Sequence, residues 1–510
     1  MFSVIDEYET FFRERIEFLT VELTHIDIMG KTGGKNDLFN SNLLLRKNIL
    51  SDIIKETEAM KDRVFAGIPF GWEEAKLLNS IEVLFDLLPV YLADTTQAYL
   101  NRKGREYISR YAPQKLPGPV VSLSSVHPTY PASIAAIECL SNSIHTKLKP
   151  LYGDNFFHGH PLFTLWEASE YYTSVIKIED IEPICDDVTC VNVYGHKIKV
   201  ADLLHLFSFG LPRWACHHIR VAGAILAHEH FHHIVYLVKL CLKYREQCLD
   251  TEPELEERFD SIILQMSTAF IEKLYPLLSD FLTHERTLHF WRIYEIVEEF
   301  LCDAVGCLLV GPAFAYATIL QLFPSTVLDE HYLEMTHPLS HIRISLQADL
   351  LRYLNMPLAA SKVEDMSKPI RDFMNSSEYR QHVGDFADHF ESWLAREETQ
   401  SFFHNFCLLL SQAIDSDKEI DESIGFKSYH FEHPREEIIW QESLERLIEE
   451  ISANNVYFGI DNKRYSPTDI LNAFWLAKEQ EYVNSKKKST VQPFQVSWRF
   501  WLSKYLDKYF

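Results

Sequence analysis

Two histidines four residues apart, His228 and His232, are the residues of this chain whose types and spacing most directly suggest chemistry. In an α-helix they lie about 40° apart around the axis, so both imidazoles can bind one zinc ion from the same face. Glu229 follows His228 and can accept a proton from a water molecule at that ion. The H-E-x-x-H pattern at 228–232 therefore predicts metal-dependent hydrolysis.

A helix over residues 219–244 must hold these side chains. The stretch lacks proline and contains one glycine, Gly223. Its apolar residues recur at a helical period on the side of the two histidines; they are Val221, Ile225, Val235 and Tyr236. Two further histidines, His230 and His233, lie about 200° and about 140° from His228. We therefore do not expect them to bind the same ion.

Catalytic zinc normally keeps three protein ligands and one open position, so a third ligand is expected. The apolar stretch 289–310 is predicted to be helical, and it carries three acids spaced four apart, Glu295, Glu299 and Asp303. Buried carboxylates are costly unless they are paired or bind a cation. We predict that Glu299 is the third zinc ligand and that Asp303 orients a ligand imidazole through its other ring nitrogen.

Two acids of the same stretch leave alternatives open. Glu298 could be the third ligand, but the residue four positions later is Cys302, which offers no orienting carboxylate. Glu295 could face solvent or pair with Arg292. Glu299 is therefore preferred as the ligand because Asp303, four residues downstream, can orient a histidine.

Three ordered motifs resemble those of the gluzincin metallopeptidases. They are H-E-x-x-H at 228–232, E-x-x-C-D-x-x-G at 299–306, and T-H-P at 336–338 with Arg343 six residues after the histidine. The residues of these motifs are most similar to those of the branch that contains the CAAX prenyl proteases and the bacterial membrane heat-shock zinc peptidases. This resemblance covers roughly residues 219–352. The resemblance implies a zincin-like core with a small β-sheet whose edge strand binds the substrate backbone. It also implies that His337 and Arg343 stabilise the substrate carbonyl or the oxyanion.

The residues themselves give a weaker case for His337 and Arg343. The Thr336-His337-Pro338 step is typical of a helix entrance, and Arg343 would fall in the first turns of the helix that follows. An arginine suits an oxyanion because it is always charged and presents a rigid fork of donors. Alternatively, Arg343 pairs with Glu334 and His337 only caps a loop.

The sequence departs from the membrane members of that branch. Cys302 stands where small apolar residues are usual, which is a mild change because a buried cysteine behaves as a small hydrophobic residue. No charge-free run of about 20 apolar residues is present. We therefore expect a soluble relative without a transmembrane segment, and prenylated substrates do not follow from the resemblance.

Composition narrows the class of protein further. The chain has 510 residues, 47% of them hydrophobic, so it can bury a large core. Its net charge of −24 argues against nucleic-acid binding. The acidic N-terminus is unlike a signal peptide, and the nine scattered cysteines are expected to be reduced. These features favour a cytoplasmic location, and none of them specifies an oligomeric state.

The predicted fold is mainly α (α+β), with a zincin-like catalytic core between two helical regions. The core is expected at 132–355, after an N-terminal helical region at 1–111 and a proline-rich linker at 112–131, and a C-terminal helical region at 356–510 follows it. Strands are expected at 174–178, 189–193 and 197–200, ahead of the zinc helix.

The function predicted from the sequence is that of a zinc-dependent peptidase with one Zn²⁺ per chain and a protein or peptide as substrate. Glu229 would be the general base. One alternative is a scaffold or binding protein whose zinc site is structural or relict, which a fourth protein ligand would indicate. Another is a narrowly specific protease of stress response or phage defence that acts only when triggered.

Overall fold

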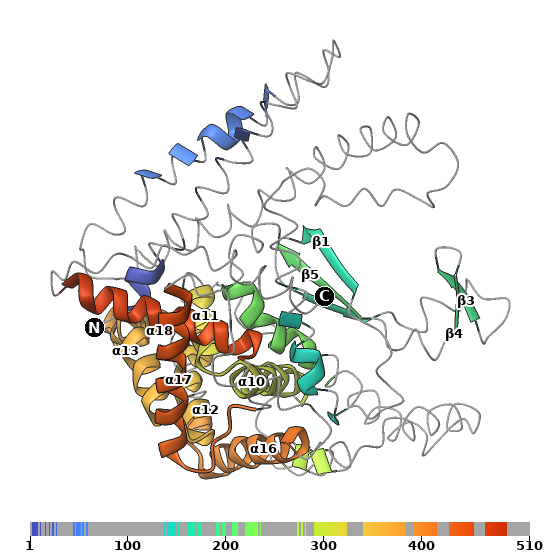
Figure 1. Cartoon of the computed structure of the whole chain (residues 1–510), viewed down its shortest axis with the longest axis vertical. Coiled ribbons are helices and arrows are strands. Elements are labelled where there is room, and N and C mark those ends of the chain that lie inside the picture. Colours follow the sequence, from blue (N-terminus) through green and yellow to red (C-terminus); the bar gives the residue numbers. More distant parts are fainter. Residues whose placement is uncertain are drawn as a thin grey trace. The chain divides into compact units, whose positions relative to one another are not determined.

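A computed structural model describes most of the residues around the predicted zinc site (Figure 1). The longer described stretches are 162–168, 172–175, 190–193, 196–199, 207–212, 220–232, 290–323, 340–383, 391–415, 428–452 and 465–486. Shorter pieces lie within 3–59, 137–151 and 273–281, and residue 235 is also described. The predicted linker at 112–131, the tripeptide at 336–338 and His233 lie outside the described residues.

The chain divides into two compact units. The first contains residues 1–4, 138–160 and 220–510, and the second contains 5–137 and 161–219. The domain limits predicted from the sequence stay a prediction; residues on both sides of position 356 belong to the first unit. Helix α12 (Ser340–Tyr353) packs there against α13 (Pro357–Met374) across a short turn.

The second unit holds the strands. β1 (Leu162–Ala168) pairs in parallel with β5 (Phe207–Pro212), and β2 (Tyr172–Val175) pairs antiparallel with the other edge of β5. β3 (Cys190–Val193) and β4 (His196–Lys199) form a separate antiparallel pair (Figure 1). β2, β3 and β4 overlap the three segments expected as strands, whereas β1 and β5 were not predicted.

The expectation of a zincin-like core with a small β-sheet is wrong. Every described element of the unit that contains residues 220–232 is a helix, and all five strands belong to the other unit. Short motifs determine where ligands lie along a helix, but they do not determine what covers that helix. Here residues 220–231 and 299–320 are buried all round, so neighbouring helices enclose them.

The helices of the first unit pack around α10 (Phe290–Val310). The elements in contact with α10 are α11 (Pro312–Leu322), α12, α16 (Glu397–Asp415) and α18 (Pro467–Lys486). Helix α14 (Ser377–Val383) contacts α13, and α17 (Pro434–Ser452) packs on α18 (Figure 1). Helix α10 is therefore the central element that positions the acids of the site. Among the described residues, none forms a helix with the length and apolar character that a bilayer crossing requires.

The carbonyl end of α10 is fixed by hydrogen bonds from other parts of the unit. The last carbonyls of a helix have no partner within it, so they need donors from elsewhere. Tyr429 donates its backbone N–H to the Leu308 oxygen at 2.7 Å, Lys147 Nζ donates to the Leu309 oxygen at 3.1 Å, and Asn472 Nδ2 donates to the Val310 oxygen at 2.6 Å. Three distant segments thereby fix the position of α10.

The Lys147→Met substitution is expected to remove a pH dependence of stability. Burial lowers the pKa of Lys147 from 10.5 to about 8, although the nearby Asp469 and Asp415 act in the opposite direction. The unfolded chain therefore binds more protons than the folded chain between these values, and the free energy of unfolding rises with pH there. The rise is at most about 3 kcal/mol.

Denaturant unfolding of both proteins at about pH 7.5 and about pH 10 measures this effect. The free energy of unfolding of the wild type relative to Lys147→Met should increase with pH. If the free energies of unfolding of wild type and Lys147→Met differ by the same amount at both pH values, the prediction is contradicted.

Candidate metal centre

The helix that carries the H-E-x-x-H motif, residues 220–232, lies inside the first unit. It is called the HExxH helix below. His228 and Glu229 are buried, and the side chain of His232 is 21% exposed. Gly223 lets the side chain of Leu140 pack closely against the other side of this helix, because a Cβ at position 223 would lie 2.3 Å from Leu140 Cδ1. The motif is thus held rigidly, with one histidine at the edge of the packed interior.

The two imidazoles and the carboxylate of Glu299 converge on one point. The Nε2 atoms of His228 and His232 are 3.0 Å apart. One carboxylate oxygen of Glu299 lies 3.3 Å from His228 Nε2, and the other lies 3.4 Å from His232 Nε2. The structure therefore brings together the three residues that the sequence predicted as ligands, from two helices about 70 positions apart in the chain.

These separations fit a zinc ion. Bonds of about 2.0–2.1 Å at a tetrahedral centre separate the ligand atoms by roughly 3.3 Å. The 3.0 Å between the two Nε2 atoms is close to that spacing, and each oxygen of Glu299 lies within 3.4 Å of one of these nitrogens. Two imidazoles and one carboxylate are also the donor set of many catalytic zinc sites, so the residues present fit the metal.

Each imidazole is oriented through its other ring nitrogen. Nδ1 of His228 lies 2.9 Å from Asp303 Oδ1, and Nδ1 of His232 lies 3.0 Å from Glu298 Oε1. An ionised carboxylate accepts the Nδ1 proton, which leaves the lone pair on Nε2 available to a metal. Asp303 thus occupies the position predicted for it.

Glu298 has a place that the sequence did not reveal. The sequence leaves Glu298 open as an alternative third ligand, but its carboxylate contacts Nδ1 of His232, the ring nitrogen on the opposite side from Nε2. Because Glu298 and Glu299 are adjacent, one turn of α10 supplies both an orienting acid and a ligand. The signal available in the sequence was this pair of acids, which can serve two imidazoles at once.

Arg343 lies behind the three ligands. Its Nε donates to Asp303 Oδ2 at 2.9 Å and its Nη2 to Asp303 Oδ1 at 2.6 Å, while Nη1 lies 3.3 Å from a Glu299 oxygen. Gln347 Nε2 also donates to Asp303 Oδ2, at 3.2 Å. Arg343 was predicted to stabilise an oxyanion, but these contacts favour a positioning role. His337 lies outside the described residues, so its predicted role stays a prediction.

Two buried carboxylates of the site are held in their charged form. Burial by itself would raise the pKa of Glu299, but His228, Arg343 and His232 hold it well below its usual value. Burial likewise opposes ionisation of Asp303, whose pKa is lowered by Arg343 and His228. Burial disfavours the charged form of His228, yet Glu299 and Asp303 raise its pKa to about 9. Both carboxylates are therefore anionic, and they attract positive charge to the imidazoles.

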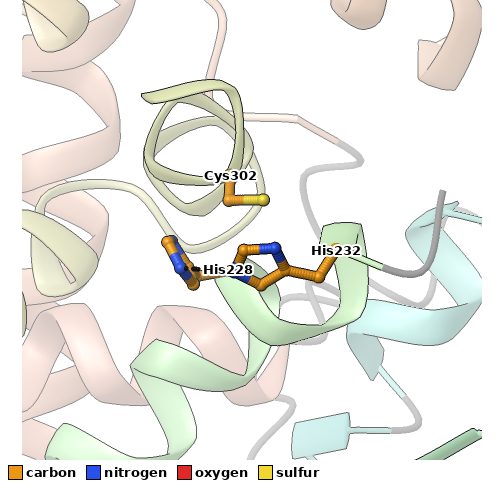
Figure 2. Close-up of side chains that lie close together, drawn as sticks. All are labelled: His228, His232 and Cys302. Atoms are coloured by element: carbon orange, nitrogen blue, oxygen red, sulfur yellow. Dashed lines mark hydrogen bonds between the residues drawn. The ribbon is translucent and has the colours of Figure 1, made fainter. Parts of the chain in front are cut away.

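Cys302 is an additional donor at the site. Its Sγ lies with one ring nitrogen of His228 and one of His232 in a group whose atoms are all within 4.8 Å of one another. Figure 2 shows the thiol of Cys302, on α10, beside the two rings of the HExxH helix. Burial raises the pKa of this thiol well above its usual value, and Glu299 and Asp303 act in the same direction. From the sequence, Cys302 is expected only to be a small hydrophobic residue.

An aromatic side chain, Phe314, packs against His228. The ring of Phe314 stacks against the imidazole of His228, with centroids 6.3 Å apart and an interplanar angle of 14°. Gly306 makes room for that ring, because a Cβ at this position would lie 2.4–2.5 Å from three Phe314 ring atoms. This packing accounts for the glycine of the E-x-x-C-D-x-x-G motif.

The Gly306→Ala substitution is expected to lower the free energy of unfolding by about 1–3 kcal/mol, since the methyl group displaces the Phe314 ring. Displacement of that ring should also disturb His228 and weaken metal binding. Combining Gly306→Ala with Phe314→Leu should restore part of the stability, because a smaller side chain relieves the overlap. Denaturant unfolding of the three variants measures both effects; additive losses in the double variant would contradict this explanation.

His230 faces away from the metal centre, as the helical period predicts. Its Nε2 lies 3.0 Å from Ser141 Oγ, and its ring packs edge-on against His145 with centroids 6.2 Å apart. It is completely buried. His230 therefore supports the packing of the HExxH helix.

No family model, curated protein or solved structure compared with this chain matches it. Function is therefore inferred from the atoms of the site. Among the described residues, His228, His232 and Cys302 form a group of donors close enough to hold a metal ion, and Glu299 contacts both imidazoles.

Proposed function

We propose that the chain is a zinc-dependent peptidase that hydrolyses peptide bonds. The observation that carries the proposal is the convergence of His228 Nε2, His232 Nε2 and the Glu299 carboxylate at 3.0–3.4 Å. Three protein ligands leave a fourth position of a tetrahedral ion for water, which is the arrangement of catalytic zinc. The H-E-x-x-H pattern is typical of metallopeptidases, and its glutamate, Glu229, is the expected general base.

A zinc ion held by these residues would polarise the substrate carbonyl and make water a good nucleophile near neutral pH. Glu229, one residue after His228, would accept the proton of the attacking water. The same carboxyl group would then deliver that proton to the nitrogen of the leaving amine, so that the base is regenerated at the end of the reaction.

The remaining residues of the centre keep the ligands in place. Asp303 and Glu298 each hold one imidazole with Nε2 towards the ion. Arg343 neutralises Asp303 and contacts Glu299, so these buried acids keep a fixed separation. Catalysis depends on such preorganisation, because a misplaced ligand or base costs rate even when the metal is bound.

A closed, structural metal site is the second candidate. The observation in its favour is the position of Cys302, whose sulfur could complete four protein ligands. A structural site would retain metal without hydrolysing peptides, and its loss would unfold the chain. The two candidates therefore differ in whether metal removal costs activity or mainly stability.

Removal and return of the metal tests the proposed function. A chelator should abolish cleavage of a peptide library, and one equivalent of Zn²⁺ per chain should restore it. Circular dichroism of the stripped protein should still show a folded chain, because α10 is fixed by Lys147, Tyr429 and Asn472 independently of the ion. Cleavage that persists in the stripped, zinc-free protein would overturn the proposal.

A further inference from the structure

The metal centre holds one more donor than the proposed reaction needs. Glu299 and Cys302 are three residues apart on α10, and both lie on the side of the helix that faces His228 and His232. Figure 2 shows Cys302 beside the two histidines. Sulfur and the two ring nitrogens all lie within 4.8 Å of one another. Zinc bonds to sulfur of about 2.3 Å would require only a small side-chain movement from this position.

Four donors from the protein would fill a tetrahedral ion. Two imidazoles, a carboxylate and a thiolate are all ligands that Zn²⁺ accepts, and the thiolate also favours zinc and cobalt over magnesium or calcium. When the thiolate is bound, no position remains for water. The same residue would therefore determine whether the centre is closed or open.

We propose that Cys302 is a displaceable fourth ligand, which closes the resting metal centre and must leave before hydrolysis. The proposal rests on the proposed function, since it concerns the metal of that site. Binding of the thiol to the ion releases one proton to solvent. Departure of the sulfur reverses this step: the thiol takes up one proton, and a water molecule enters the vacated position.

The surroundings of Cys302 are consistent with two positions of its sulfur. The residue is completely buried, and it is followed by Asp303, which Arg343 and Gln347 hold in place. Rotation about the Cα–Cβ bond of Cys302 can therefore move its sulfur while Glu299 and Asp303 keep their contacts. The backbone of α10 need not shift between the closed and the open centre.

The substitution of cobalt for zinc gives a readout that does not depend on activity. A thiolate bound to Co²⁺ produces a charge-transfer absorption in the near ultraviolet, whereas nitrogen and oxygen ligands produce only the weaker visible bands. Purified wild type, Cys302→Ala and Cys407→Ala are each stripped of metal and titrated with Co²⁺. Cys407 is the matched control, because it is a buried cysteine on α16 and not in the donor group.

The expected result is a charge-transfer band in wild type and in Cys407→Ala, and no such band in Cys302→Ala. Cys302→Ala should still bind one Co²⁺ with visible bands and, reloaded with zinc, should cleave a peptide library at least about tenfold faster than wild type. That gain follows if the open form is about a tenth of the population or less.

Three outcomes would overturn this proposal. The first is a wild-type spectrum without the charge-transfer band, and the second is the same band in Cys302→Ala. The third is loss of metal from Cys302→Ala without any gain in hydrolysis, which would make the thiolate a permanent structural ligand. Failure of the proposed function looks different: wild type would then bind no stoichiometric Co²⁺, or the zinc-loaded Cys302→Ala and wild-type proteins would both lack hydrolysis.

Discussion

The Glu229→Gln variant is expected to bind zinc as the wild type does and to lose hydrolysis almost completely. Glutamine keeps the size of the side chain but cannot accept a proton, and general acid–base catalysis contributes about 10²–10⁴ in rate. Glu229 is buried beside His228 without being one of the three converging ligands, so metal content should not change. Peptide-library cleavage and elemental analysis on the same preparation measure both quantities.

The matched control is Glu449→Gln, which makes the same change at an exposed position of α17. It should retain both zinc and activity. In the cell of origin, a proteome-wide comparison of new peptide termini between wild type and Glu229→Gln would identify the substrates. Hydrolysis by purified Glu229→Gln at the wild-type rate would remove Glu229 from the mechanism.

The second large effect concerns the two adjacent acids of α10. Substitution of Glu299 by Ala should abolish tight zinc binding, because it removes one of three ligands. The same change at Glu298 removes only the partner of His232 Nδ1, and such a loss typically costs about 10–100-fold in metal affinity. Zinc affinity measured by competition with a chromogenic chelator distinguishes the two variants.

The conservative variants separate charge from shape. Glu298→Gln keeps an acceptor for His232 Nδ1 and should weaken zinc binding less than Glu298→Ala. Glu299→Gln replaces the ligand carboxylate by a neutral amide and should still bind zinc poorly. Tighter zinc binding in Glu299→Ala than in Glu298→Ala would exchange the roles of the two residues.

The sequence was informative where helical periodicity fixes geometry. The spacing of His228 and His232 places both rings on one face, and the spacing of Glu299 and Asp303 places a ligand and an orienting acid one turn apart. Both expectations depend only on contacts along single helices. The exclusion of His230 follows from the same period, and the structure directs it towards Ser141.

Contacts between helices could not be read in the same way. The pairing of Glu298 with His232, of Arg343 with Asp303, and of Cys302 with the two rings depends on how α10 and α12 rotate against the HExxH helix. A sequence pattern gives the apolar face of each helix, but not the rotation at which two such faces meet. Arg343 was predicted to lie near the zinc ligands. In the structure its guanidinium group donates hydrogen bonds to Asp303.

The error over the β-sheet has a related cause. Three short motifs resembled those of a family with a mixed core, yet they occupy only a few turns of helix. The apolar residues around them are compatible with burial by helices or by a sheet. In this chain helices of the same unit bury them, while the strands belong to the other unit. Motif order therefore anticipated which side chains lie close together, but not the scaffold that surrounds them.

Crystals of the full chain, purified with zinc present, allow the most direct test of the central claim. Diffraction data collected above and below the zinc absorption edge locate the metal without reference to any enzymatic assay. A single anomalous peak at bonding distance, about 2.1 Å, from His228 Nε2, His232 Nε2 and a Glu299 oxygen is predicted. A peak elsewhere in the molecule, or no peak between the three residues in a fully zinc-loaded crystal, would contradict it.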